Sequence, residues 1–161
     1  MQKEEIRLHF LTFESIDELN TEDAFLLREA QLVTQFAYAP YSHFQVGAFA
    51  RLNNGMTVSG TNQENASFPA GICAERTLMS AASVLFPGVG IQSIAISYDH
   101  LHGKSNHPIS PCGICRQSLV EFEQRTGTPI RIIMGGLQGK VHVIEDAIHL
   151  LPLGFNASDV R

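Results

Sequence analysis

Apolar residues recur along this chain at two spacings, one typical of strands and one typical of helices. Ile6, Leu8 and Phe10 alternate with polar residues, which predicts a short strand near the N-terminus. A helix is predicted to begin at residues 21–23, because acidic side chains there suit the positive end of a helix dipole. Apolar positions continue at helical spacing toward Pro40, which is expected to end this helix.

The two patterns then alternate. Two β-rich runs flank Asn53-Asn54-Gly55, whose residues tolerate the positive φ of a tight turn, so a hairpin is predicted. Strands are further predicted at 91–98, 129–136 and 139–145, and helices from Cys73 to about Leu85, at 111–125 and at 146–152. This alternation favours an α/β sandwich with some parallel strands. We find no repeat and no linker, so we expect a single domain over residues 1–161.

The composition and net charge of the chain disfavour several classes of protein function. A chain of 161 residues that is 44% hydrophobic can bury a core without disulfides. Its net charge of −5 argues against a protein that binds the phosphates of nucleic acid, and favours a small neutral ligand. The sequence has no apolar window of membrane-spanning length and no signal-peptide pattern, so we expect a cytoplasmic protein without a membrane partner.

Three cysteines carry the strongest chemical signal. An odd number in a reducing compartment argues against a disulfide framework. Cys112 and Cys115 have a spacing that suits one tetrahedral ion, and Cys73 can supply a third thiolate. Both motifs fall where a helix is predicted to begin, and the dipole of a helix N-terminus stabilises thiolate. Three protein ligands leave the fourth position open, as in a catalytic zinc site.

Glu75 lies two residues after Cys73, too close on the same turn to be a comfortable fourth ligand. A carboxylate beside the open position can accept a proton from water and later donate it to a leaving group. Three thiolates would weaken the acidifying effect of zinc. We therefore expect Arg76 and Arg116, each next to a ligand, to hydrogen-bond thiolate sulfurs and restore it.

Other interpretations stay open for each part. A lone C-x-x-C also occurs in redox pairs and in structural metal sites. A structural site would need a fourth ligand, and a histidine could supply it. His100, His102 and His107 lie in one polar loop, where we expect solvated side chains, and the sequence gives that loop no purpose.

The combination "CAE…PCGIC" resembles the zinc-dependent nucleoside deaminases, and within them the small homotetrameric cytidine deaminases. The segments "YSHFQVGA", "TNQENASFPAGICAERT", "SPCGICRQ" and "LLPLGF" resemble family segments in the expected order. The resemblance implies a three-layer α/β/α sandwich around a mixed five-stranded sheet, with residues 1–20 as an N-terminal extension. It also implies one zinc ion per chain, a homotetramer (or a homodimer), and hydrolysis of cytidine and 2′-deoxycytidine to uridine and 2′-deoxyuridine with release of ammonia.

The resemblance also assigns roles to residues. Cys73, Cys112 and Cys115 would bind zinc, and Glu75 would move protons. The expected substrate contacts are Phe44 on the base, the backbone of Ala74 on the pyrimidine ring, Asn62 and Glu64 on the ribose hydroxyls, and Phe155 across a subunit boundary. Phe68 stands where a tyrosine is usual in relatives, so a hydroxyl is lost there.

Three rival functions remain at this stage. The first is a deaminase of a modified or bulky nucleoside, such as the blasticidin type, which Asn62 and Glu64 argue against because they suit an unmodified ribose. The second is a deaminase that edits nucleic acid, which the acidic balance disfavours. The third is a non-catalytic zinc module, which would need a fourth ligand. The sequence does not rank cytidine against 2′-deoxycytidine.

Overall fold

The computed structural model describes residues 1–160. Its centre is one six-stranded sheet with the strand order β1-β6-β5-β4-β2-β3. The strands are β1 (Leu11–Phe13), β2 (Phe44–Leu52), β3 (Thr57–Thr61), β4 (Ile91–His100), β5 (Arg131–Gly135) and β6 (Val141–Ile144). The β4–β5 pair is parallel, whereas the pairs β1–β6, β5–β6, β2–β4 and β2–β3 are antiparallel. The sheet is therefore mixed, as predicted.

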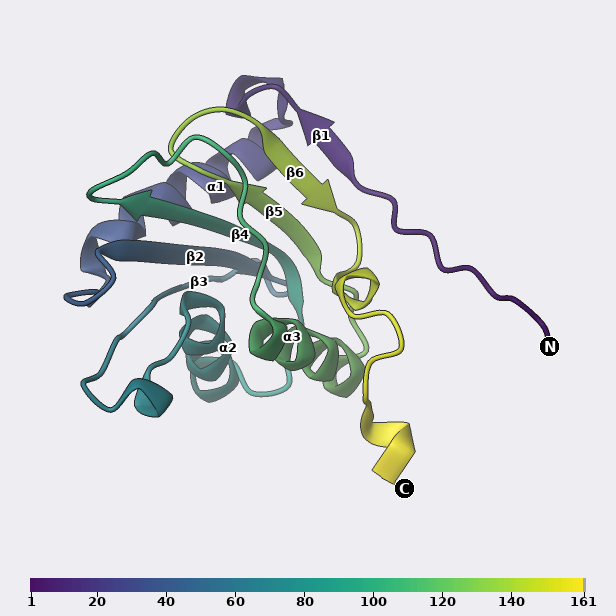
Figure 1. The fold of residues 1–161 in the computed structure, drawn as a ribbon. Helices are drawn as coiled ribbons and strands as arrows, with labels where there is room; N and C mark the ends of the chain where they lie inside the picture. The colour runs from purple at the N-terminus through teal and green to yellow at the C-terminus, as the bar shows by residue number, and fades with distance from the viewer. Residues whose placement is uncertain (161) are drawn as a thin grey trace.

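Helices cover both faces of this sheet (Figure 1). α1 (Thr21–Val33) packs on one face, and α2 (Ala74–Leu85) and α3 (Gly113–Thr126) lie on the other. Successive residues of a strand point to opposite faces, so Ile132 lies in the core under α2 and α3, and Ile133 in the core under α1. Within residues 1–160, no helix combines the length and the apolarity that a bilayer crossing requires.

Several elements lie where the sequence predicts them. α2 begins directly after Cys73 and ends at Leu85. β2 and β3 form the predicted hairpin, and Gly55 in its turn has a φ of +82°. β5 and β6 also pair as a hairpin, and the short helix predicted at 146–152 is a 3₁₀ helix at Ala147–Leu150, after which a further 3₁₀ helix follows at Ala157–Val160.

The first long helix ends earlier than predicted. α1 stops at Val33 and a 3₁₀ turn follows at residues 34–36, whereas the apolar spacing predicted helix as far as Ala39. The reason is a tertiary contact: the Tyr38 N–H donates to the Asn62 carbonyl at 3.0 Å, and the Tyr38 carbonyl accepts from the Glu64 N–H at 2.8 Å. Residues 37–39 therefore pair with the loop after β3 and cannot continue the helix.

The predicted N-terminal strand is present at the sheet edge, but it begins later than the alternation of Ile6, Leu8 and Phe10 indicated. Residues 1–10 form no strand and are all exposed, and β1 begins at Leu11, which pairs with Val143 of β6. β6 ends at Ile144, so the residues before Leu11 have almost no partner strand to pair with. β1 nevertheless adds a sixth strand at the sheet edge, which is the difference from the five strands that the resemblance implied.

A buried carboxyl group joins α3 to the C-terminal segment. Glu123 is 8% exposed, and its Oε1 accepts the N–H of Ile130 at 2.7 Å and that of Ala147 at 3.0 Å. Burial raises the pKa of Glu123 to about 7, and the neighbouring Asp146 carboxyl adds to this shift. The folded protein therefore holds a proton here that the unfolded chain releases at lower pH.

This proton makes stability depend on pH. Because the pKa of Glu123 is raised on folding, its contribution is fully present below the unfolded pKa and is lost as pH rises toward about 7. We expect the melting temperature to fall by about 3–5 °C between pH 5 and pH 8 through this group. In Glu123→Gln, whose amide keeps an acceptor and never ionises, thermal unfolding should show a flatter pH profile; a profile parallel to that of wild type would exclude this role.

Candidate active site

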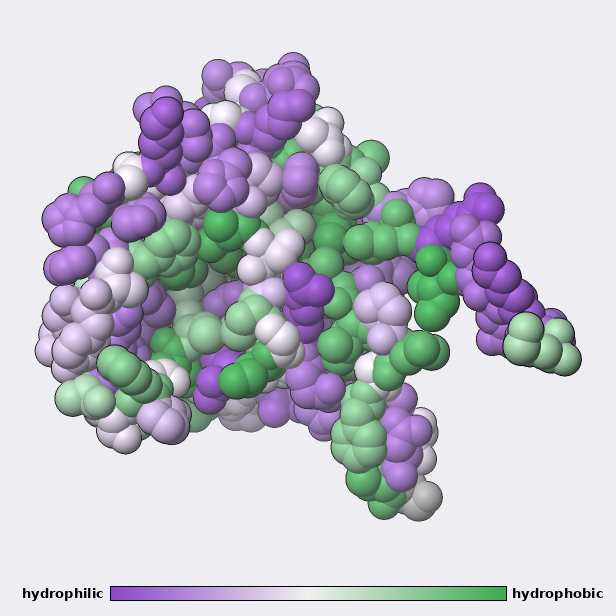
Figure 2. Space-filling view, in the orientation of Figure 1, coloured by the Kyte–Doolittle hydropathy of each residue, from purple (hydrophilic) through white to green (hydrophobic). Residues whose placement is uncertain are grey.

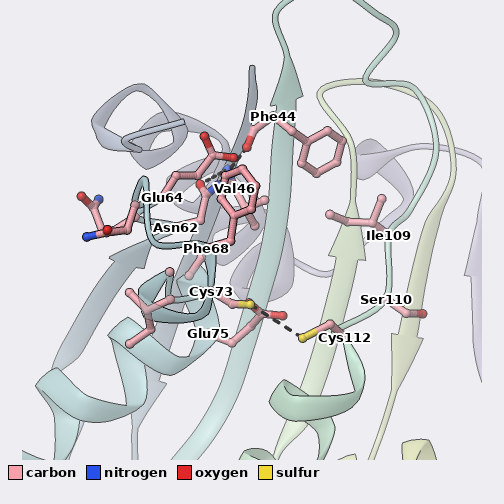
Figure 3. A pocket seen from close by; sticks show the side chains of 15 residues that line it. Phe44, Val46, Asn62, Glu64, Phe68, Cys73, Glu75, Ile109, Ser110 and Cys112 are labelled. Carbon is pink, nitrogen blue, oxygen red and sulfur yellow. Dashed lines mark hydrogen bonds between the residues drawn. The ribbon is translucent and has the colours of Figure 1, made fainter. Parts of the chain in front are cut away.

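A cavity of about 390 Å³ opens beside the N-terminal ends of α2 and α3, a volume typical of small-molecule sites. Four segments line it: β2, the loop after β3, the start of α2 and the loop before α3. Figure 3 shows Cys73, Cys112 and Glu75 at one end, and Phe44, Asn62 and Glu64 at the other. The metal-type and ligand-type residues predicted from sequence therefore share one cavity.

The three cysteines converge at the end of the cavity next to Glu75. The Sγ atoms of Cys73 and Cys112 lie 3.7 Å apart, and those of Cys112 and Cys115 lie 3.4 Å apart. All three lie within 4.8 Å of one another. A tetrahedral zinc ion with bonds of about 2.3 Å holds its sulfur ligands about 3.8 Å apart. The thiol groups therefore fit one zinc ion with little rearrangement.

The same cluster has no fourth protein ligand. Across residues 1–160, it is the one group of three or more His, Cys, Asp or Glu side chains whose ligand atoms come this close together. No histidine belongs to it, although the sequence left that possibility open. A structural zinc site is closed by four protein ligands, whereas a catalytic site keeps one position open. The ligand set is that of a catalytic site.

Both motifs stand at helix starts. Cys73 is the N-cap of α2 and Cys112 the N-cap of α3, and neither helix start has a side-chain cap hydrogen bond. Backbone N–H groups of each first turn are thus left to stabilise thiolate. Gly60 of β3 sets the position of α2, since a Cβ there would lie 2.5 Å from the Ala74 carbonyl oxygen. Any larger residue at position 60 would push α2, and Cys73 with it, off the sheet.

The thiols have unequal acidities. A hydrogen bond from Cys115, and to a smaller extent the charge of Arg76, lower the pKa of Cys73 to about 6. The same hydrogen bond and burial raise the pKa of the Cys115 thiol. The thiol of Cys73 is therefore more readily ionised than that of Cys115.

Glu75 lies on the first turn of α2 and is 4% exposed. Burial raises the pKa of its carboxyl group, and a negative charge on Cys73 raises it further. The backbone N–H of Glu75 hydrogen-bonds to its own carboxylate and opposes this shift, as does the charge of Arg76. A carboxyl group with a raised pKa at the wall of a cavity can both accept and donate a proton near neutral pH.

The two arginines differ in what they contact. Arg116 donates from Nε to the Pro111 carbonyl at 2.9 Å and from Nη1 to the Leu150 carbonyl at 3.2 Å. In this structure its hydrogen bonds therefore hold the backbone on both sides of α3, and not a sulfur. The charge of Arg76 favours ionised Cys73 and ionised Glu75. Among residues 1–160 neither arginine hydrogen-bonds a thiol sulfur, so the predicted contacts of Arg76 and Arg116 with the sulfurs stay a prediction.

Asn62 and Glu64 lie at the end of the cavity opposite the cysteines. The Asn62 amide bridges β2, accepting from the Val46 N–H at 2.7 Å and donating to the Phe44 carbonyl at 2.9 Å. Oε2 of Glu64 accepts from the Tyr41 N–H at 2.8 Å and the Ser42 N–H at 3.3 Å. A hydrogen bond from the Ser42 hydroxyl, together with these two backbone bonds, lowers the pKa of Glu64, so it is an ionised acceptor. Both backbone donors use Oε2, so the carboxylate keeps acceptor capacity on Oε1 for a ligand hydroxyl.

The remaining wall is apolar. Phe44, Val46 and Ile109 line the cavity, and Figure 3 shows Phe44 and Ile109 on the same side of it. The sequence singled out Phe44 and the start of α2, which includes the cavity-lining Ala74. It gave no signal for Ile109 or Ser110, because these residues belong to a polar loop without periodicity.

Phe68 and Phe155, the two other aromatic residues that the sequence singled out, lie in different places. Phe68 lines the cavity, is 75% exposed and meets the Tyr41 ring edge-on with centroids 5.8 Å apart. Phe155 lies outside this cavity: it is 60% exposed, its carbonyl accepts from Gln117 Nε2 at 2.8 Å, and it lines a separate hollow between α2 and α3. A role for Phe155 in a neighbouring subunit stays a prediction.

A family model described as the cytidine and deoxycytidylate deaminase zinc-binding region matches residues 20–128, well over half of the chain. The chain belongs to this family. The match contains both cysteine motifs, Glu75, Asn62 and Glu64, so the predicted zinc-dependent deaminase is confirmed. One zinc ion per chain fits the cluster of Cys73, Cys112 and Cys115.

Relatives and solved structures that match most of the chain support the same family. The chain is 36% identical over 136 residues to a cytidine deaminase of Halalkalibacterium halodurans, which covers 84% of this chain and 96% of the relative. Among solved structures, the cytidine deaminase of Burkholderia pseudomallei matches with a TM-score of 0.71 and 35% identity, covering 85% of this chain and 100% of that one. The cytidine deaminase of Mycobacterium tuberculosis matches with a TM-score of 0.65 and 28% identity, covering 84% and 98%. The predicted three-layer fold is confirmed.

Proposed function

We propose that this family member hydrolyses cytidine and 2′-deoxycytidine to uridine and 2′-deoxyuridine and releases ammonia. One observation carries the proposal: a buried proton carrier, Glu75, adjoins a three-thiol zinc site in a cavity whose other end offers the Glu64 carboxylate. A cavity of this size and lining can hold a cytosine ring near the metal and a sugar at the end formed by Asn62 and Glu64. Curated relatives that carry the name cytidine deaminase support the same substrate class.

The metal and the protein groups would contribute different parts of the reaction. When bound to the three thiolates, zinc lowers the pKa of water and acts as a Lewis acid. Glu75 accepts a proton from the attacking water and delivers it to N3 of the cytosine ring. It then accepts the proton of the new hydroxyl group on C4 and delivers it to the amino group on the same carbon. The amino group leaves as ammonia, and C4 becomes the carbonyl carbon of uridine. The backbone at Ala74 and the apolar wall around Phe44 hold the ring and exclude water from this exchange.

The sugar end selects a nucleoside. Glu64, fixed by two backbone N–H groups, can accept from a ribose hydroxyl, and Asn62 shares the same end of the cavity. No lysine or arginine lines the cavity among the described residues, so a 5′-phosphate would meet no cationic partner there. A free nucleoside therefore fits better than a nucleotide or a nucleic acid strand.

The ribose contact is testable by one substitution. Glu64→Gln removes the charge of the acceptor, so we expect KM for cytidine to rise about 10- to 100-fold, the cost of a hydrogen bond to a charged group. With 2′,3′-dideoxycytidine, which lacks the hydroxyls, wild type and variant should have similar KM values. The matched control is Glu121→Gln, the same change at an exposed residue of α3. Equal effects on both substrates would refute the hydroxyl contact and leave the deamination itself untouched.

Three further assignments belong to this proposal. We infer a homotetramer, with a homodimer as the alternative, in which Phe155 reaches a neighbouring site; its exposed side chain is compatible with this role. We infer a cytoplasmic location, since three free thiols that must bind metal suit a reducing compartment. We also infer one domain with residues 1–20 as an extension, because the family match starts at residue 20.

A further inference from the structure

Tyr98 is a large buried side chain at the end of β4, and it is 1% exposed. Its ring stacks on Phe44 with centroids 4.8 Å apart and planes only 16° from parallel. The contact is diagonal across two strands, since Val46 pairs with Tyr98 and Phe44 pairs with His100. Tyr98 thus backs the aromatic residue that lines the substrate cavity, although Tyr98 itself lines no part of it.

The hydroxyl of Tyr98 reaches in the other direction, toward the loop that leads into α3. It lies 3.1 Å from Nδ1 of His107 and 3.4 Å from the carbonyl oxygen of Lys104. One phenol hydrogen cannot serve two acceptors well. Both hydrogen bonds are therefore satisfied together when Nδ1 of His107 carries the proton and donates to the phenol oxygen, while the phenol donates to the carbonyl.

The loop after β4 forms part of the site. Ile109 and Ser110 line the substrate cavity two and three residues after His107, and Cys112 follows. A further hydrogen bond holds the start of the loop, next to β4: the Ser105 Oγ accepts the His100 N–H at 2.8 Å. The side chain of Tyr98 therefore connects two residues of the apolar wall of the cavity, Phe44 directly and Ile109 through His107.

We propose that Tyr98 and His107 are a positioning pair that sets the spacing between Phe44 and Ile109 in the apolar wall of the substrate cavity. Neither residue touches the reacting atoms, so neither is catalytic. The pair gives a purpose to the histidine-containing loop that the sequence left without one. The proposal rests on the function proposed above insofar as the cavity binds the base of a nucleoside.

The kinetic test uses Tyr98→Phe, which keeps the stacked ring and removes only the hydroxyl. Loss of one hydrogen bond should loosen the loop wall, so we expect KM for cytidine to rise about three- to tenfold with kcat within about twofold of wild type. His107→Ala should give a similar rise, and the double variant should be no worse than either single variant. His107→Asn, whose amide N–H can stand in for Nδ1–H, should restore most of the affinity. Lys104→Ala is the matched control, since its exposed side chain makes no hydrogen bond within residues 1–160.

A second readout separates this proposal from the proposed function. Hydrogen exchange of zinc-loaded protein should be faster in peptides of residues 101–112 for Tyr98→Phe and His107→Ala, and unchanged in α1. If wild type fails to convert cytidine, the proposed function fails, and the exchange data still decide whether the pair holds the loop. Unchanged exchange and unchanged KM in both variants would overturn the proposal, as would equal effects from Lys104→Ala.

Discussion

Replacing Glu75 with glutamine should lower kcat for cytidine by a factor of about 10²–10⁴ while zinc stays bound. Glutamine has nearly the same shape and fits the same buried turn of α2, but it cannot accept a proton from water or relay one to the leaving amino group. Glu75 is 4% exposed and is not one of the three thiol ligands, so the metal site should survive the change. The decline of the cytosine absorbance band measures kcat, and metal analysis measures zinc.

The comparison needs zinc-loaded protein in both samples. Glu121→Gln, the same change on the exposed face of α3, should behave as wild type. If Glu75→Gln keeps a large fraction of kcat with one zinc ion per chain, another group carries the proton and the assigned mechanism fails. If it loses both zinc and activity, Glu75 also supports the metal site.

Removing one thiol should have the other large effect. Cys115 is completely buried, and its Sγ lies 3.4 Å from that of Cys112, so no water-exposed group can replace it. In Cys115→Ser we expect zinc to fall from one ion per chain to near zero and turnover to be lost with it. A hydroxyl binds zinc far more weakly than a thiolate, and two sulfur ligands do not hold the ion.

Metal analysis after gel filtration measures this outcome directly, and a thermal melt reports whether the zinc-free chain stays folded. Ser118→Ala, one turn further along α3, is the control for a small change near the same helix start. Full zinc content in Cys115→Ser would mean that the ion is held elsewhere. The cluster of three thiols would then have to be abandoned as the metal site.

Local sequence signals predicted the parts of the site that depend on local structure. Cys73 and Cys112 mark helix starts, and both are N-caps in the structure. The C-x-x-C spacing places Cys112 and Cys115 on one turn of α3, where their sulfurs meet. These features need no knowledge of distant contacts, so the sequence alone was sufficient for them.

Features set by distant contacts were not predictable in the same way. The end of α1 depends on the pairing of Tyr38 with the loop at residues 62–64. The apolar alternation of Ile6 and Phe10 predicted a strand, but β6 is too short to give these residues a partner. An alternating apolar pattern shows that a segment can form a strand. Whether it does so depends on a neighbouring strand that is long enough to pair with it.

The wall of the site shows the same limit. Tyr98 reads as one more apolar position of a buried strand, and His107 as a solvated loop residue. Only the three-dimensional structure brings the phenol within 3.1 Å of the imidazole and stacks the ring on Phe44. The sequence contained the residues of this contact but no spacing that would connect them.

The most direct test of the central claim is a balance of products from purified, zinc-loaded wild-type protein given cytidine. The account predicts that uridine and ammonia appear in equal amounts, at a rate that falls to background when zinc is removed and returns when zinc is restored. If cytidine and 2′-deoxycytidine both remain intact while each chain holds one zinc ion, the assignment as a deaminase of unmodified cytosine nucleosides is contradicted.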